Sequence, residues 1–268
     1  MAGKVEKNQA GTYSKYRILE GPARWVFITL STIAVVLFIC RVFNLAPFGF
    51  AMLGFTFYYV LLGIYLPMGF LYFPWKKGPG RGKITPSDIF LAVLVGAACF
   101  YLSANPLTIA YGGWGVYPPL IAFIAALVIW FLLLELGRRA VGLMFSGVVA
   151  LFSFYPLFAN FMPGPLWGKN YSMLRTAAFH AISDGSILGP PMQVFASILG
   201  GYMVFAVVLQ VVGGADFFRD FALSIMGHLR GGAAKVSIFT SSLFGSISGS
   251  VAANIVATGS FTIPTMKK

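Results

Sequence analysis

Hydroxyl, glycine and amide residues are concentrated in one apolar segment near the C-terminus, residues 235–264. The segment is apolar enough to enter a bilayer, yet it carries a dense set of Ser, Thr and Gly and a single Asn, Asn254. Hydroxyl and carbonyl oxygens are hard ligands, which suit Na⁺ better than a transition metal. The segment is therefore where chemistry is expected in this chain.

The middle of this segment, Gly245–Ser250, is unfavourable for a continuous helix. Glycine lowers helix stability, and serine offers the backbone competing hydrogen bonds. Two half-helices meeting there would form a re-entrant hairpin that enters at Lys235 and leaves at Lys267 and Lys268 on the same side. Broken transporter helices use freed carbonyls for cations and half-helix N-termini for anionic groups. The alternative is that the small residues only allow close helix packing, and composition alone favours neither interpretation.

The rest of the chain must position this segment in lipid. Of the 268 residues, 58% are hydrophobic and 10% charged, with a mean hydropathy of +0.83, whereas soluble domains carry about a quarter charged residues. A span needs about 20 apolar residues. Six runs qualify, so we predict an all-α, polytopic helical membrane protein. The runs are Trp25–Phe43, Phe48–Phe73, Asp88–Ala104, Pro118–Leu134, Ala140–Phe161 and Pro190–Val212.

Basic and uncharged loops alternate between these runs. The chain has 19 basic and 7 acidic residues, and the cations cluster in the tail 1–23, in the loop Lys76–Lys83 and around Arg138. The positive-inside rule places these segments in the cytoplasm and Met162–Ser183 outside. We therefore predict a multi-pass protein of the bacterial inner membrane with a cytoplasmic N-terminus, lipid as its solvent and no nucleic-acid partner. The tail lacks the features of a cleaved signal peptide.

Few other residues suggest chemistry. A membrane enzyme would need a His/Asp/Glu cluster within the spans, and only His180 and Asp184 come near one, both close to a predicted membrane surface. We therefore predict no enzyme, no cofactor and no disulfide between Cys40 and Cys99. The spacing of residues 215–229 favours an amphipathic helix on the cytoplasmic surface. Tryptophans at run ends are interpreted as headgroup anchors; they are Trp25, Trp75, Trp114 and Trp167.

The segment Leu243–Lys268 closely resembles the first hairpin of TRAP transporters, the tripartite ATP-independent periplasmic transporters. The similarity is greatest to TAXI-type permeases, in which a four-helix small subunit is fused to a twelve-helix large subunit. Three further stretches fit the resemblance, namely Glu135–Gly142, Gly189–Gln193 and His228–Val236. The first 134 residues match only in helix number and loop character.

At the hairpin tip the agreement with the family pattern is nearly complete. Val251 and Ala257 depart from it, so no hydroxyl is available at these two positions. The resemblance implies a substrate- and ion-binding role for Ser246, Ser248, Gly249, Ser250, Asn254, Thr258 and Gly259. Na⁺, as a possible coupling ion, would contact Ser248, Ser250 and Asn254.

The resemblance also implies a function and a domain organisation. The chain would be part of an elevator-type secondary transporter that accepts an organic acid from a periplasmic binding protein, driven by Na⁺ or H⁺. Residues 24–136 would form the scaffold domain, and 137–268 the start of the transport region, with the surface helix 215–229 and the hairpin 235–264. The chain is expected to be only the N-terminal portion, because a second hairpin related by inverted repeat is needed, so the remainder of the large subunit would be a partner. The alternative is a non-transporting membrane scaffold or assembly subunit.

Overall fold

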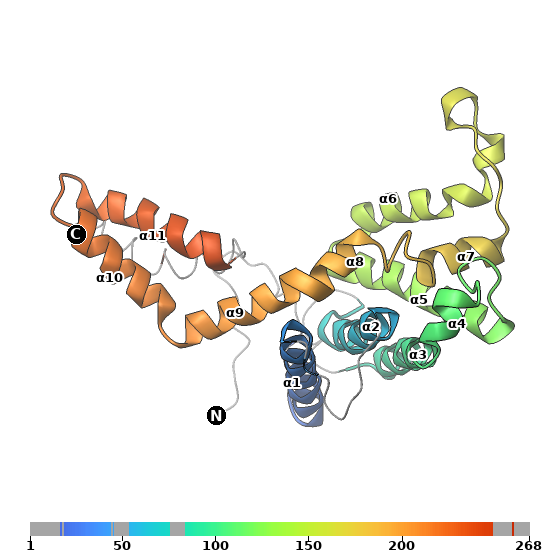
Figure 1. Cartoon of the computed structure of the whole chain (residues 1–268), viewed down its shortest axis with the longest axis horizontal. Coiled ribbons are helices and arrows are strands. Elements are labelled where there is room, and N and C mark those ends of the chain that lie inside the picture. Colours follow the sequence, from blue (N-terminus) through green and yellow to red (C-terminus); the bar gives the residue numbers. More distant parts are fainter. Residues whose placement is uncertain are drawn as a thin grey trace. The chain divides into compact units, whose positions relative to one another are not determined.

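The computed structural model describes residue 17 and residues 19–43, 45, 54–75, 84–248 and 259. Throughout these residues every regular element is helical (Figure 1). The sequence-based prediction of an all-α membrane protein is therefore confirmed. The packing divides the chain into two compact units, Met1–Val194 and Phe195–Lys268, and each is described by itself.

Five helices of the described chain are long and apolar enough to cross a membrane. They correspond to five of the six predicted runs. Their bounds are α1 Pro22–Val42, α2 Gly54–Tyr72, α3 Pro86–Ser103, α5 Leu120–Ala140 and the continuous helical run Pro190–Leu209. The short helix α4, Pro106–Tyr111, lies in the uncharged segment between α3 and α5.

The prediction of a full-length span over Ala140–Phe161 is wrong. Its helix α6 covers only Leu143–Phe154, followed by 3-10 turns at Tyr155–Leu157 and Ala159–Phe161. Gly142 has a φ of 134°, a conformation that favours glycine and breaks the helix after α5. Pro156 cannot donate to the helical ladder, so the backbone tightens there. The resulting helix is shorter than the roughly 20 residues that a span needs.

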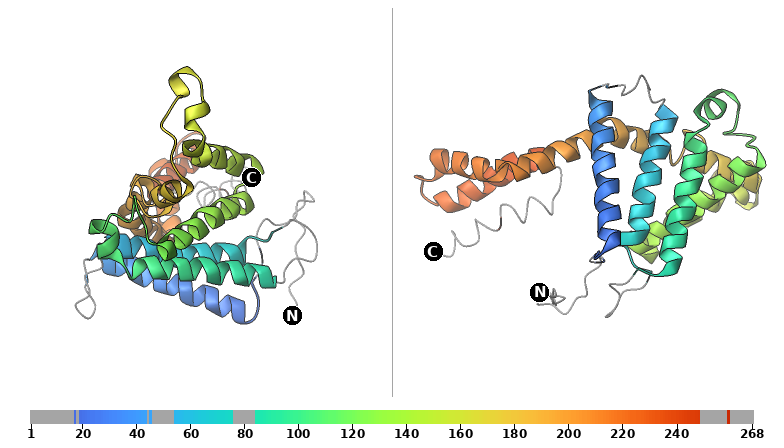
Figure 2. Two further views of the ribbon diagram at one scale, coloured as in Figure 1. Left: turned by 90° about the vertical axis from the view of Figure 1, so that its right-hand side faces the viewer. Right: turned by 90° about the horizontal axis from the view of Figure 1, so that it is seen from below.

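The core of the first unit lies between α2, α3, α5 and the helix α7, Met173–Ala181. Helices α1, α2 and α3 lie side by side (Figure 2). Glycine allows close approaches between these helices, since a Cβ at Gly63 of α2 would lie 3.2 Å from the Cβ of Cys99 on α3. Close packing through small residues is the usual way in which membrane helices associate. The buried core side chains include Tyr59, Phe70, Val95, Leu102, Ile129 and Ile182.

The second unit contains a π-helical turn at Phe195–Leu199, α9 at Gly200–Val211, α10 at Gly214–Met226 and α11 at Gly232–Ser248. Gly213 and Gly231, with φ values of 88° and 70°, make the turns before α10 and α11. The buried seam of this unit includes Ala222, Val236 and Phe244. A helix thus occupies most of the segment predicted at 215–229, and its position on the membrane surface stays a prediction.

The alternation of basic and uncharged loops predicts which side of the membrane each connection faces. A cysteine at Tyr111, which is exposed at the end of α4, should react with a membrane-impermeant maleimide added to intact spheroplasts. A cysteine at Gly80, in the basic loop, should react only after permeabilisation. Gly112 is the poorer labelling site, because a Cβ there would lie 2.5 Å from the carbonyl oxygen of Thr108. The reverse labelling pattern would invert the assignment of every span.

Candidate functional site: the polar hairpin segment and two buried polar networks

The predicted binding residues begin on α11 and continue beyond the part of the chain that the structure describes there. The helix runs unbroken through Gly245 and Ser246 to Ser248, the last residue of it that the structure describes, so the predicted break does not fall before Ser248. The hydroxyl of Ser246 donates to the carbonyl oxygen of Leu243 at 2.8 Å. That bond is local to the helix and leaves the oxygen lone pairs available as acceptors.

The remaining predicted site residues are largely outside the structural description. Gly249, Ser250, Asn254 and Thr258 lie outside the described residues, and Gly259 is helical. The described residues therefore do not test whether these groups converge, and the cation site stays a prediction. Among the described residues, no group of three or more His, Cys, Asp or Glu side chains could hold a metal ion.

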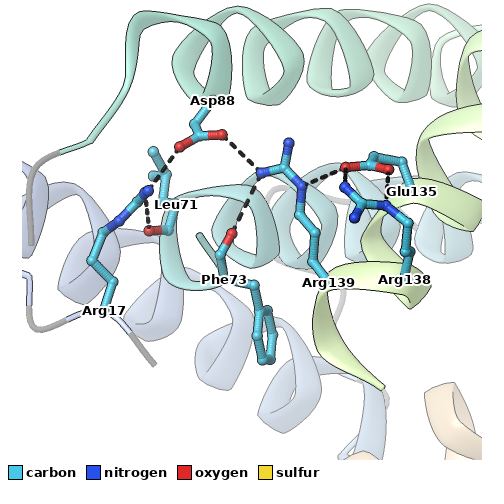
Figure 3. A network of polar contacts seen from close by, with 7 residues as sticks. All are labelled: Arg17, Leu71, Phe73, Asp88, Glu135, Arg138 and Arg139. Carbon is cyan, nitrogen blue, oxygen red and sulfur yellow. Dashed lines mark hydrogen bonds and ion pairs between the residues drawn. The ribbon is translucent and has the colours of Figure 1, made fainter. Parts of the chain in front are cut away.

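A buried ion-pair network, the Asp88 network, joins three helix ends and the chain before α1 (Figure 3). Asp88 is in the first turn of α3, where a carboxylate is favoured by the helix dipole. Its Oδ2 lies 2.8 Å from Nη2 of Arg17, and its Oδ1 lies 2.8 Å from Nη1 of Arg139. The three charged groups are shielded from solvent, so one carboxylate holds two guanidinium groups in place.

The same two arginines also donate hydrogen bonds to carbonyl oxygens at the C-terminal end of α2. Arg17 Nη1 donates to the carbonyl oxygen of Leu71 at 3.0 Å, and the Arg17 backbone amide donates to that of Tyr72 at 3.1 Å. Arg139 Nη1 donates to the carbonyl oxygen of Phe73 at 3.4 Å. The last carbonyls of a helix have no partner within the helix, and cations are favoured beside them. The arginines therefore serve both the carboxylate and the helix end.

Glu135 extends the Asp88 network along α5. Arg138 donates to both carboxylate oxygens of Glu135, at 2.8 and 2.7 Å, and Arg139 Nε donates to one of them at 2.8 Å. The guanidinium carbons of Arg138 and Arg139 lie 4.8 and 5.0 Å from the centre of the Trp75 ring. Trp75, predicted only as a headgroup anchor, therefore also makes cation–π contacts.

Sequence reasoning missed the Asp88 network, although signals for it were present. Asp88 is an acidic residue inside an apolar run, and such a charge in a membrane helix needs a partner. Glu135, Arg138 and Arg139 are spaced at i, i+3 and i+4, which places them on one helix face. Nothing in the sequence indicated that Arg17, in the N-terminal tail, would complete the set.

A second polar network, the His180 network, joins α5, α6 and α7. The indole Nε1 of Trp130 donates to the hydroxyl of Ser153 at 3.1 Å. The His180 Nε2 lies 2.8 Å from the carbonyl oxygen of Ser153, and its Nδ1 lies 2.8 Å from the hydroxyl of Ser186. A carbonyl only accepts, so Nε2 carries the proton, and Nδ1 accepts from Ser186. Every polar atom of the imidazole is thus paired.

The structure shows which part of α5 His180 contacts. Its ring stacks on that of Trp130 with centroids 4.8 Å apart, and Trp130 is the eleventh residue of the 21-residue helix α5. His180 therefore lies beside the middle of α5 and not at its end. Burial lowers the pKa of His180, while its hydrogen bond to the Ser153 carbonyl acts in the opposite direction. Asp184 is exposed, so the two residues form no buried acid–base pair.

The fold defines a polytopic helical membrane protein whose buried charges are engaged in holding helices together. A family model for the tripartite ATP-independent periplasmic transporter, DctM component, matches residues 128–268, which is 141 of 268 residues. The chain therefore belongs to this transporter family. Comparisons with curated proteins and with solved structures found no match.

Family membership has direct consequences. The chain is a membrane subunit of a TRAP secondary transporter, a family of transport components and not of enzymes. A tripartite system implies association with a periplasmic binding protein and another membrane component. Glu135, Arg138 and Arg139 lie inside the matched residues, whereas Arg17 and Asp88 precede them. The Asp88 network therefore joins the DctM segment to the N-terminal helices.

Two adjacent arginines provide a matched test of the Asp88 network. Arg139→Gln should lower the free energy of unfolding by about 3–5 kcal/mol, because it removes one of the two buried partners of the Asp88 carboxylate and leaves Oδ1 without an ion pair. Arg138→Gln should cost about 1 kcal/mol or less, because its side chain is 31% exposed, against 0% for Arg139, and exposed pairs contribute little. Thermal unfolding of the purified protein in detergent measures both. Equal losses for the two variants would contradict the assigned roles.

The two histidines of the chain provide a second matched test. In the unfolded chain His180 binds a proton below about pH 6.5, whereas its lowered native pKa keeps the folded form neutral to lower pH. Its contribution to stability is therefore complete above about pH 6.5 and is lost as the pH falls through the native pKa. His180→Gln should reduce the fall in melting temperature between pH 7 and pH 5, and His228→Gln, at an exposed position, should not. An unchanged pH dependence in His180→Gln would refute the neutral, buried state.

Proposed function

We propose that this protein is the TAXI-type membrane subunit of a binding-protein-dependent importer of an organic acid, coupled to Na⁺ or H⁺. In this proposal residues 24–136 form a small-subunit-like scaffold. Residues 137–268 begin the transport region, in which the hairpin 235–264 is half of the mobile transport domain of an elevator-type transporter. The observation that carries the proposal is the DctM match, which runs through the whole polar hairpin segment 235–264.

The hairpin segment suits a carboxylate and a cation for a physical reason. The C-terminal end of a helix carries a partial negative charge and free carbonyls, whereas an N-terminal end offers free amides. The structure describes α11 as far as Ser248, and in this proposal a break near Gly245–Ser250 leaves the last carbonyls of the first half-helix suited to a cation. A returning half-helix after Ser250 would present its amides to a substrate carboxylate. In this proposal Na⁺ is bound by the Ser250 hydroxyl, the Asn254 amide oxygen and backbone carbonyls such as those of Ser246 and Ser248.

A second candidate function is a non-transporting scaffold. It is favoured by the Asp88 network, since the buried charges Arg17, Asp88 and Arg139 are all engaged with one another or with helix ends. These three charges therefore hold helix ends together, which is a structural role. A scaffold of this kind would be insensitive to changes in the hairpin segment.

Substitution of the hairpin amide distinguishes the two functions. In the complete transporter, reconstituted with its binding protein, Asn254→Ala and Ser250→Ala should raise the Na⁺ concentration for half-maximal uptake several-fold. A cation site that loses one neutral oxygen ligand weakens but does not disappear. The amount of assembled transporter should not change. Uptake measured with radiolabelled substrate over a series of Na⁺ concentrations provides the readout.

The matched control is Ser242→Ala on α11. Ser242 is exposed, and its hydroxyl donates to the carbonyl oxygen of Ile238 at 2.9 Å, so its loss should leave the Na⁺ dependence unchanged. Reduced thermal stability with unchanged Na⁺ dependence in Asn254→Ala would favour the packing interpretation of the segment. Uptake driven by H⁺ alone would exclude the Na⁺ role.

A further inference from the structure

The segment Tyr155–Ser172 between α6 and α7, here called the 155–172 loop, has a defined conformation without an α-helix. Backbone amides bridge its two sides, with Gly168 donating to Ala159 and Tyr171 to Pro156, both at 3.0 Å. The hydroxyl of Tyr155 also donates to the carbonyl oxygen of Leu166. Figure 1 shows the loop, in yellow, projecting away from α6 and α7. The loop is therefore ordered by its own hydrogen bonds.

The projecting part of the loop presents large apolar side chains. Phe161, Leu166 and Trp167 are 79%, 59% and 66% exposed. Lys169 is the only charged residue in 155–172, and Arg175 follows in the first turn of α7. An exposed apolar patch with a cationic edge marks an interaction surface.

The backbone of the loop argues against burial in the lipid core. Its 3-10 turns and extended stretches are irregular, and the backbone amides of Lys169 and Asn170 have no hydrogen-bond partner among the described residues. Irregular backbone exposed to hydrocarbon is not tolerated, because each unpaired group costs several kcal/mol. The exposed rings therefore lie in water or in the headgroup layer, where a protein can reach them.

We propose that the 155–172 loop is the docking element for the substrate-loaded periplasmic binding protein. The proposal rests on the proposed function, since it needs the loop on the periplasmic side. Exposed tryptophan and phenylalanine rings are typical binding hot spots, and a preordered loop loses little entropy on binding. Because the loop carries a cation and no acidic residue, the matching surface is an apolar depression with acidic side chains at its rim.

Direct binding tests the docking surface without requiring transport. The complete transporter in lipid nanodiscs is titrated with its own substrate-loaded binding protein, and the double variant Phe161→Ala/Trp167→Ala is compared with the wild type. Removal of two hot-spot rings should weaken binding at least about tenfold. Lys169→Glu should weaken binding more at low salt than at high salt, because ions screen the attraction that the substitution removes. The control is Leu151→Ala/Phe152→Ala, at equally exposed positions on α6, which should bind as the wild type does.

Two results would overturn the docking role. One is unchanged affinity in the double variant. The other is quenching of Trp167 fluorescence by brominated lipids that persists after the binding protein is added. That result would show that the loop serves only as a headgroup anchor. If the wild-type transporter binds its binding protein through this loop but shows no uptake, the proposed transport function is refuted. The docking surface would then remain supported.

Discussion

The first unit depends on one constraint, that a charge placed among apolar helices must be paired within the protein. Asp88 stands inside an apolar run, and Arg17 and Arg139 meet it at 2.8 Å from opposite sides. The desolvation of such a group can exceed its Coulombic attraction, so the pair need not add net stability, but breaking it is costly. The helix ends that supply these residues and their carbonyl partners are thereby fixed relative to one another. In this chain a buried charge determines which packing is possible.

The same constraint governs the neutral polar groups. His180, Trp130 and Ser153 occupy the contact of α5, α6 and α7 and pair with one another or with a backbone carbonyl. The short α6 contacts α5 partly through hydroxyls, since Ser146 donates to the carbonyl oxygen of Leu134 at 3.1 Å. Apolar side chains give little preference between protein and lipid as neighbours. Hydrogen bonds therefore supply much of the specificity with which these helices meet.

Both polar networks of the first unit include residues of α5. The DctM match begins at residue 128, within α5, and α5 carries Trp130 of the His180 network and Arg139 of the Asp88 network. One helix thus belongs both to the N-terminal bundle and to the family-matched region. A transporter needs a rigid part against which another part moves, and a helix fixed by buried polar contacts suits the rigid part. The hydroxyl-rich hairpin segment 235–264, which begins on α11, is, in our proposal, the part that binds ion and substrate.

Composition and run length by themselves determined that the protein is helical and polytopic, because about 20 apolar residues are needed to cross lipid whatever the tertiary structure. They also located the segment that carries the predicted site residues, of which the structure describes only the beginning on α11. Only the structure showed where α6 ends and which helix His180 contacts. Glycine and proline at the ends of α6 shorten a run that is uncharged throughout. Stacking on Trp130 places His180 beside the middle of α5, a contact between residues 50 positions apart. The partnership of Arg17, Asp88 and Arg139 joins residues up to 122 positions apart, and no local pattern encodes such a pairing, because it forms only when separate helix ends meet.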